Sequence, residues 1–236
     1  MSGDTNPWWS PVSTPTDKAP RSRSPVGNLV PLVWPIRASV SCPVVVPPPP
    51  ETFAAVLEAR RSRRRMRRAP LRQLINMLAY ATAPRGRLEG DVFLRSRRPG
   101  PTAGAFHPIE TVLVDWRGHP RVMRYDALSH RLELLAVSNV EPLRNFARAC
   151  ADMLPEAQGT ALVFIGHEAR VTAAYEDPAS LLWRDSGALS QTLFLAATAF
   201  GLAFCPLDIL GREVIQAIGL PRDAVATGAV LLGRQR

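Results

Sequence analysis

The chain has few cysteines, and the three that it has stand far apart. Cys42, Cys150 and Cys205 offer neither a disulfide framework nor the closely spaced ligand pairs of a structural zinc site. The four histidines show no H-x-x-x-H or H-E-x-x-H spacing, so the sequence gives no support to a metal centre. We therefore expect a protein of a reducing compartment, the cytoplasm, that works without a metal.

Long apolar runs and nucleotide-binding glycine signatures are scarce as well. The longest uncharged segment, residues 186–207, approaches the length of a membrane span, yet it contains Ser, Thr and Gln residues and a proline. We expect a helix buried in the core or in a subunit interface, and no membrane partner. No G-x-G-x-x-G follows a strand-like segment, which argues against a Rossmann domain. The first residues also lack the pattern of a secretory signal peptide.

Proline is abundant in one part of the chain. Of the 23 prolines, 12 fall in residues 1–50, together with Trp8, Trp9 and Trp34. Such a density of proline prevents a regular apolar period, so we expect an irregular or polyproline arm. Its tryptophans either dock the arm on the folded body or on a second subunit, or they form a recognition segment for a partner. We therefore divide the chain into an N-terminal arm, 1–50, and a folded domain, 51–236.

Apolar periodicity beyond the arm predicts interleaved helices and strands. A helix begins at Phe53 and is expected to run into an arginine-rich bend, and a second helix follows Pro70. Residues 86–104 form an expected loop. Further helices are predicted at 142–153 and 211–218, and strands at 109–116, 121–125, 132–135, 161–166 and 225–232. Because the order lacks a regular βαβ rhythm, the expected class is α+β, with a central sheet covered by helices.

Arginine is concentrated in a single run. Seven of the nine residues 60–68 are arginine, and without them the formal net charge of +9 would be +2. A protein that coats DNA usually spreads its basic residues over a face, so we expect no nucleic-acid partner. A dense run indicates a bound anion, an acidic partner or a solvated basic helix end. Arg60, Ser62 and Arg64 combine guanidinium forks with a hydroxyl, which suits a phosphomonoester.

Four blocks of sequence, in their order, resemble one known family. They are F-x-x-V-L-E-A-R-R-S-R-R at 53–64, P-T-A-G-A-F-H-P-I-E at 101–110, R-Y-D-A-L-S-H-R-L-E-L-L at 124–135, and the uncharged block at 186–207. Together they resemble the SagB-type dehydrogenases, a branch of the FMN-dependent nitroreductase superfamily. The resemblance covers Val44 to the C-terminus. It implies a nitroreductase-like fold, with a mostly antiparallel central sheet flanked by helices, and a homodimer that holds FMN at its interface.

The resemblance also implies which residues contact FMN. Arg60, Ser62 and Arg64 match the motif at the ribityl phosphate, and Arg234 is a further phosphate candidate, as is Arg236. The segment along the isoalloxazine ring is matched by Pro101, Thr102, Ala103, Gly104 and Ala105. The segment whose backbone faces the reactive N5 side is matched by Pro206, Leu207 and Asp208.

The implied reaction is the two-electron oxidation of thiazolines and oxazolines to azoles in ribosomally made peptides. It implies a peptide substrate and a cyclodehydratase as partner. Relatives often carry a Lys-Tyr pair, and here the corresponding residues are Ala174 and Tyr175. A tyrosine has a pKa near 10 and needs a neighbouring cation to act as a base. Either Arg170 or Arg184 supplies that charge for Tyr175 as the catalytic base, or Tyr175 only lines the pocket.

Two other functions remain open from the sequence. One is a general nitro- or quinone reductase that uses a reduced nicotinamide. The other is a non-catalytic scaffold or peptide-binding subunit that has kept the fold, which the missing lysine at Ala174 and the Trp- and Pro-rich arm favour.

Overall fold

The computed structural model describes residues 19–23, 31–87, 89–91, 93–117 and 120–236. The expectations for Trp8, Trp9 and the signal-peptide region, and for the turn at 118–119, lie outside these residues. Among them, no helix is both long and apolar enough to cross a membrane.

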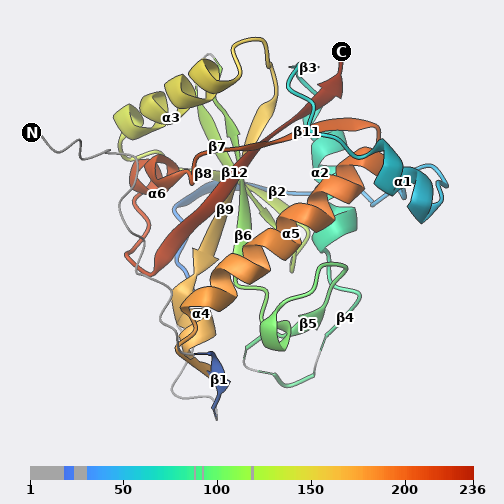
Figure 1. Ribbon diagram of the computed structural model, residues 1–236. Helices are drawn as coiled ribbons and strands as arrows, with labels where there is room; N and C mark the ends of the chain where they lie inside the picture. The colour runs from blue at the N-terminus through green and yellow to red at the C-terminus, as the bar shows by residue number, and fades with distance from the viewer. Residues whose placement is uncertain (1–18, 24–30, 88, 92, 118–119) are drawn as a thin grey trace, which may run out of the picture.

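A twisted antiparallel sheet forms the centre of the molecule (Figure 1). In the described part of the chain it has eight strands, in the order β11-β12-β9-β6-β7-β8-β2, with β3 pairing beside β9 at the end of β12. The strands are β2 (Ile36–Ser41), β3 (Met66–Arg67), β6 (Ile109–Asp115), β7 (Arg121–Asp126), β8 (Arg131–Leu135), β9 (Thr160–His167), β11 (Leu202–Leu207) and β12 (Ala224–Gln235). The expected antiparallel α+β class is confirmed.

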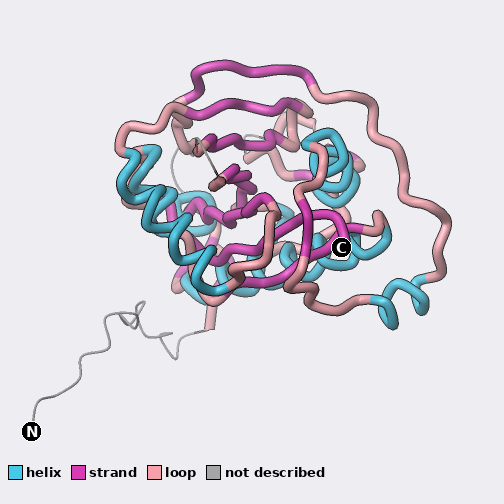
Figure 2. The backbone as a smooth tube through the Cα atoms, turned by 90° about the horizontal axis from the view of Figure 1, so that it is seen from above, coloured by secondary structure: helices cyan, strands magenta, loops and turns pink. Residues whose placement is uncertain are grey.

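Helices cover both faces of this sheet, as the view from above shows (Figure 2). One face packs against α2 (Leu71–Thr82) and α5 (Ala179–Ala199), and the other against α3 (Val140–Met153) and α6 (Arg212–Ile218). Side chains of β9 alternate between the two cores, with Leu162 in one and Val163 in the other, and all its residues are buried. A strand covered on both faces reads as a continuous apolar run, which explains why the sequence predicted it.

The arginine run does not continue the helix before it. This helix, α1 (Phe53–Ala59), starts as predicted but ends before the arginines, so the expected extension is wrong. The Arg63 N–H instead donates to the Phe204 carbonyl oxygen of β11 at 3.0 Å. The arginines therefore lie in extended chain along an edge strand, because tertiary pairing outweighs local helix propensity. The predicted arginine-rich connection between two helices is confirmed, although it is an extended segment that contains β3 rather than a bend, and α2 starts directly after Pro70.

Two other segments differ from expectation. The loop predicted at 86–104 contains a short pairing of β4 (Gly86–Arg87) with β5 (Ser96–Arg97) and a 3-10 turn, Ala103–Ala105. The uncharged block at 186–207 is not one helix. Its helical part belongs to α5 and ends at Ala199, and Gly201, with φ of +65°, lets the chain reverse into β11.

The arm is more regular than its proline content predicted. Within it β2 pairs with β8 as the outermost strand of the sheet, and β1 (Arg21–Ser22) pairs with β10 (Tyr175–Glu176). The prediction of an irregular arm is therefore wrong for these segments. Trp34 is 9% exposed and lies under the Arg124 guanidinium, whose centre is 4.9 Å from the indole ring. The expected docking of the arm on the folded body is confirmed for this tryptophan.

Candidate functional site

The arginine segment, residues 60–68, lies at the end of the sheet where β11 begins and β12 ends. Arg67 of β3 lies opposite Arg234 of β12 in the backbone ladder of the sheet. The Arg60 guanidinium centre lies 4.9 Å from the Phe194 ring of α5, and that ring stacks on Phe204 at 4.5 Å. A cation is therefore held in place by an aromatic face rather than by a carboxylate.

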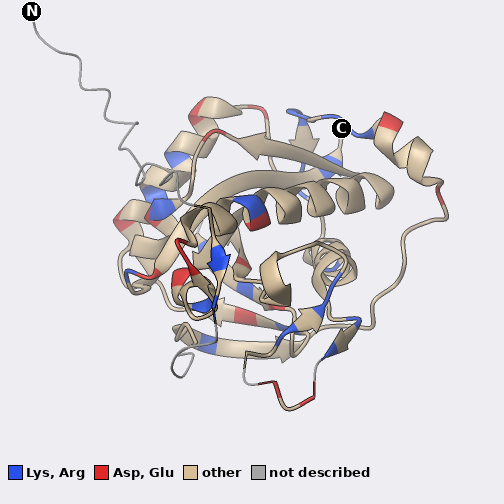
Figure 3. Ribbon diagram, turned by 60° about the horizontal axis from the view of Figure 1, so that its bottom comes forward, with Lys and Arg blue, Asp and Glu red and all other residues tan. Residues whose placement is uncertain are grey.

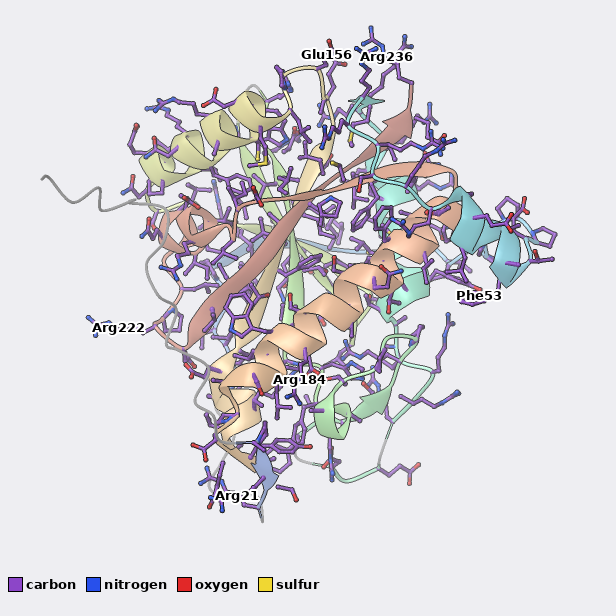
Figure 4. The ribbon with its side chains drawn as sticks, viewed as in Figure 1. Arg21, Phe53, Glu156, Arg184, Arg222 and Arg236 are labelled. Atoms are coloured by element: carbon purple, nitrogen blue, oxygen red, sulfur yellow. The ribbon has the colours of Figure 1, made fainter. Side chains whose placement is uncertain are left out.

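Most of the charge of this segment is uncompensated. Arg65 pairs with Glu156 at 2.8 Å and Arg68 pairs with Asp115, but the described residues place no carboxylate within ion-pair distance of Arg60 or Arg64. In Figure 3, basic residues lie on the chain next to the C-terminus, and Figure 4 shows Arg236 at the same end. Guanidinium groups without acidic partners at an exposed end of a sheet form an anion-binding surface.

The segment 206–208 continues from the arginine segment along the outer edge of β11. Because the Phe204 carbonyl faces outward, the alternation of the strand turns the backbone of Pro206 outward as well. Proline lacks a backbone N–H, but at this outward-facing position the N–H would not bond to a neighbouring strand, so the sheet loses no hydrogen bond. Pro206 and Asp208 are exposed and Leu207 is half-buried. From Phe204 to Leu207 the strand advances about 10 Å, which brings both predicted contact segments to one edge.

The ring segment, residues 101–105, is anchored by a buried carboxylate. Asp185 of α5 is 7% exposed, and its oxygens accept from the Thr102 hydroxyl at 2.5 Å and from the Ala103 N–H at 3.1 Å. Burial raises the pKa of Asp185, and these two hydrogen bonds oppose that rise. Asp185 thus orients the loop from the helix beneath it. Sequence reasoning missed this role, because the aspartate lies more than 80 positions away in the chain.

Gly104 is required by the shape of the ring segment. It adopts a φ of +57°, and a Cβ atom there would lie 2.6 Å from the Phe106 ring and 2.9 Å from the Tyr175 hydroxyl. Ala105 and His107 also adopt positive φ, at +59° and +46°, although they are not glycine. Backbone strain of this kind is often held at functional sites. The structure therefore brings the predicted base, Tyr175, against the predicted ring segment.

A third cation, besides the two that the sequence suggested, lies near Tyr175. The Arg170 Nη1 donates to the Phe106 and His107 carbonyl oxygens at 3.4 and 3.3 Å, and Arg184 is exposed on α5 (Figure 4). Arg95 instead lies with its guanidinium centre 5.7 Å from the Phe106 ring, which packs edge-on against Tyr175.

Arg95 is held in this position by Asp91. The Asp91 carboxylate accepts from both Nε and Nη2 of the guanidinium, the shortest contact being 2.9 Å. The hydrogen bond to Asp91 is the main cause that raises the pKa of Arg95, and the nearby Tyr175 contributes. Because both residues fall in a segment without periodicity, the sequence offered no signal for this pair.

A small open pocket lies beside the ring segment, and Pro101 and Thr102 form part of its lining. Its lining includes Arg98, His107, Glu110, Tyr125 and Asp185. Burial lowers the pKa of His107 to about 4, so this imidazole is neutral near pH 7, and its Nε2–H donates to the Ser96 carbonyl at 2.7 Å. Burial likewise raises the pKa of Tyr125.

The two groups of predicted contacts lie on opposite sides of α5. Asp185 holds the ring segment and Phe194 supports Arg60, and these two helix residues are about two and a half turns, or roughly 13 Å, apart. Because this separation is a half turn more than two full turns, Asp185 and Phe194 lie on opposite faces of the helix. One chain thus joins Tyr175 to residues 101–105 and the arginine segment to 206–208, but it does not join the two groups to each other.

Comparison with protein families gives one match that spans the folded part of the chain. The model of the nitroreductase family matches residues 46–234. None of the curated proteins matches the sequence.

Solved structures share the fold at low sequence identity. A protein of Ralstonia eutropha JMP134, provisionally assigned as a nitroreductase, is 19% identical with a TM-score of 0.63, over 92% of this chain and 99% of that chain. A similarly assigned protein of Anabaena variabilis is 19% identical with a TM-score of 0.61, over 84% and 42%. A chain of the E. coli microcin synthetase McbBCD complex, solved with truncated pro-MccB17 bound, is 20% identical with a TM-score of 0.51, over 73% and 65%.

Proposed function

The chain belongs to the nitroreductase family, whose members are generally FMN-dependent oxidoreductases, and we propose that it binds FMN and acts as such an enzyme. We further propose that its substrate is a peptide-derived azoline, which it oxidises to an azole in natural-product biosynthesis. The single observation that carries flavin binding is that Arg60 and Arg64, beside the outer edge of β11, have no carboxylate partner among the described residues.

The chemistry of this edge fits a flavin mononucleotide. A phosphomonoester carries close to two negative charges at neutral pH, and Arg60 and Arg64 supply two guanidinium groups without carboxylate partners among the described residues. Ser62 lies between them and is exposed, so its hydroxyl is free to donate. Further along the edge, the outward-facing backbone of 206–208 allows a flat ring to approach closely. Arg234 lies at the same end of the sheet.

We also propose a homodimer. Because α5 separates the arginine segment from the ring segment, one bound flavin cannot contact both segments of the same chain. Two copies related by a two-fold axis would solve this, with the arginine segment and 206–208 of one chain facing the ring segment and Tyr175 of the other. Each of the two equivalent sites would then use both chains.

In the proposed reaction the azoline ring loses two protons and two electrons, as one hydride and one proton, and gains its second ring double bond. When bound, FMN supplies the acceptor for the electron pair and one hydrogen, which no side chain of the protein can provide. The other hydrogen leaves as a proton, and Tyr175 takes it. Arg95, on the other side of the Phe106 ring, is the proposed source of positive charge near this base, in the role that the missing lysine at Ala174 leaves open.

Two observations support a peptide substrate over a small nitro compound. The four sequence blocks resemble the SagB-type branch in particular, and the fold is shared by a chain of a microcin synthetase complex. A cyclodehydratase is then the partner that would supply the azoline. The general nitro- or quinone reductase is the second candidate, because the family match itself favours it. A scaffold without turnover is the third, favoured by Ala174 alone.

The visible absorption spectrum of the purified protein tests flavin binding, together with mass spectrometry of what heating releases. We expect a yellow protein that releases FMN. Arg64→Ala should weaken FMN binding about tenfold or more, since a hydrogen bond to a charged group contributes about 1.5–3 kcal/mol. Arg222→Ala is the matched control, because Arg222 is exposed at another part of the surface (Figure 4). A colourless protein that excess FMN neither loads nor stabilises would refute the proposal.

Substrate class is tested with the flavin-loaded protein. Under the proposed function an azoline-containing peptide reduces the flavin, and Tyr175→Phe abolishes this reduction without loss of bound FMN. Reduction by NAD(P)H followed by turnover of a nitroaromatic compound or a quinone, with no response to the azoline, would favour the second candidate instead.

A further inference from the structure

A short piece of the N-terminal arm is paired with the strand that carries Tyr175. In this β1–β10 pairing Arg21 lies opposite Glu176, and a 3.1 Å ion pair joins their side chains. One residue after β1, the Arg23 N–H donates to the Ala174 carbonyl oxygen at 3.0 Å. Figure 4 shows Arg21 at the end of the molecule where α4 (Glu168–Thr172) and the start of α5 lie. The edge of β10 therefore already accepts an extended chain.

The register of this pairing places Ser22 beside Tyr175. The two residues lie directly opposite each other, so their side chains point to the same face of the ladder. Hydrogen-bonded pairs alternate with non-hydrogen-bonded pairs in an antiparallel ladder. Because the neighbouring Arg23 bonds to the chain opposite, Ser22 and Tyr175 form the non-hydrogen-bonded kind, in which side chains approach most closely. The Tyr175 hydroxyl in turn lies against Gly104 of the ring segment.

We propose that the edge of β10 binds an extended substrate peptide, and that residues 21–23 occupy this edge until such a peptide displaces them. The inference rests on the proposed function for the role of Tyr175, but not for the binding itself. A peptide that pairs in the register of β1 brings its central residue directly opposite Tyr175 in the ladder. In the arm this residue is an unmodified serine, which resembles the precursor of an oxazoline but has no ring to oxidise.

The contacts that hold the arm are few, which suits an occupant that must leave. The ladder is two residues long, and Arg21, Ser22 and Arg23 are all exposed. The ion pair of Arg21 with Glu176 joins side chains that are 72% and 48% exposed, and exposed pairs of this kind contribute little. The arm competes chiefly because it belongs to the same chain, which gives it a high effective concentration. A separate peptide with a longer ladder can therefore replace it.

The same contacts indicate which peptides the edge selects. Backbone pairing requires an extended conformation and is independent of side chains. Glu176 favours a basic residue one position before the central one, as Arg21 is in the arm. The expected occupant is thus an extended peptide with a serine, threonine or cysteine-derived residue at its centre and a basic residue before it.

A pair of proline substitutions separates the ladder from other effects. Arg23→Pro removes the N–H that donates to Ala174, whereas Ser22→Pro removes an N–H that points away from β10. Both prolines are compatible with extended backbone, but Arg23→Pro also loses the hydrogen bond that the Arg23 Nη2 donates to the Thr172 carbonyl oxygen, so a third variant is needed. Arg23→Ala keeps the ladder bond and removes only the side chain. All variants are made in the full chain.

The probe is a fluorescein-labelled peptide with the sequence of residues 19–24, Ala-Pro-Arg-Ser-Arg-Ser, and its binding is followed by fluorescence anisotropy with and without FMN. We expect Arg23→Pro to bind the probe on the order of tenfold more tightly than the unsubstituted protein, since the competing segment is released. Ser22→Pro should bind it as weakly as the unsubstituted protein does, and Arg23→Ala should lie nearer to Ser22→Pro than to Arg23→Pro.

Equal binding of the probe by Arg23→Pro and Ser22→Pro would overturn the inference, as would an Arg23→Pro protein that is folded by circular dichroism but shows no gain. The measurement without FMN separates this inference from the proposed function. If Arg23→Pro binds the probe more tightly but the protein never binds flavin, the peptide site is supported and the proposed oxidoreductase function is refuted. If the protein binds flavin but Arg23→Pro binds the probe no more tightly, the peptide site is refuted and the proposed function stands.

Discussion

The substitution Gly104→Ala tests whether the ring segment and Tyr175 form one structural unit. Gly104 adopts a φ of +57°, and an added Cβ would lie 2.6 Å from the Phe106 ring and 2.9 Å from the Tyr175 hydroxyl. Gly201 is the matched control, because it has a φ of +65° and nothing within 4 Å of its Cβ position. Both substitutions force alanine into a left-handed conformation. Only the first one also displaces two aromatic side chains.

The magnitudes follow from these two contributions. The left-handed conformation costs alanine about 1–2 kcal/mol, which both variants share. Overpacking at Gly104 adds about 1–3 kcal/mol, because real Cβ atoms do not approach so closely. At roughly 2–4 °C per kcal/mol for a domain of this size, Gly104→Ala should lower Tm several degrees further than Gly201→Ala does.

Thermal unfolding by calorimetry and reduction of bound flavin by substrate are the two assays. Gly104→Ala should lose most of its turnover per bound flavin, and it should also bind FMN less tightly, because Gly104 belongs to the ring segment that is proposed to lie along the flavin. Equal Tm values for Gly104→Ala and Gly201→Ala, with equal turnover, would refute the argument that Gly104 positions Tyr175.

Three further outcomes are expected. His107→Gln should flatten the stability of the protein between pH 4 and 6.5 in denaturant titrations: the folded-state pKa of about 4 lies below 6.5, so the unfolded chain binds more protons there and His107 lowers stability as pH falls. Asp185→Asn should remove the opposite slope above pH 3.8, because a raised folded-state pKa makes stability fall as pH rises through that window; an unchanged profile in either variant would contradict the burial of that group. Arg63→Pro removes the N–H that donates to Phe204 and should weaken FMN binding measured by fluorescence titration. Arg61→Pro should weaken it less, because the Arg61 N–H has no backbone partner among the described residues.

The arginine run illustrates how far local sequence carries the prediction. Its charge and its Arg-x-Ser-x-Arg order were evident from residues 60–64 alone, and both point to an anion. Its conformation was not evident, because helix propensity continues through the arginines. The decisive contact is the Arg63 N–H on Phe204, more than 100 positions away, which draws the chain along the edge of β11.

The surroundings of Tyr175 also show what the sequence could not predict. The sequence singled out Tyr175 and noted that Ala174 leaves it without a cation, but it named Arg170 and Arg184 as replacements. The structure adds a third cation, Arg95, on a loop without periodicity, and the choice among the three stays a prediction. Neither a pattern nor a spacing relates Arg95 to Tyr175, because Phe106, the ring between them, comes from a third segment.

The sequence by itself determined the fold class, the buried strand β9, the core position of α5 and the charge of the arginine segment. These properties depend on the composition and period of contiguous residues, which burial on one or two faces dictates. Only the tertiary structure decided that Asp185 anchors the ring segment, that α5 separates this segment from the arginines, and that the arm pairs with β10. Each of these depends on contacts between residues distant in the chain, and no local period encodes such contacts.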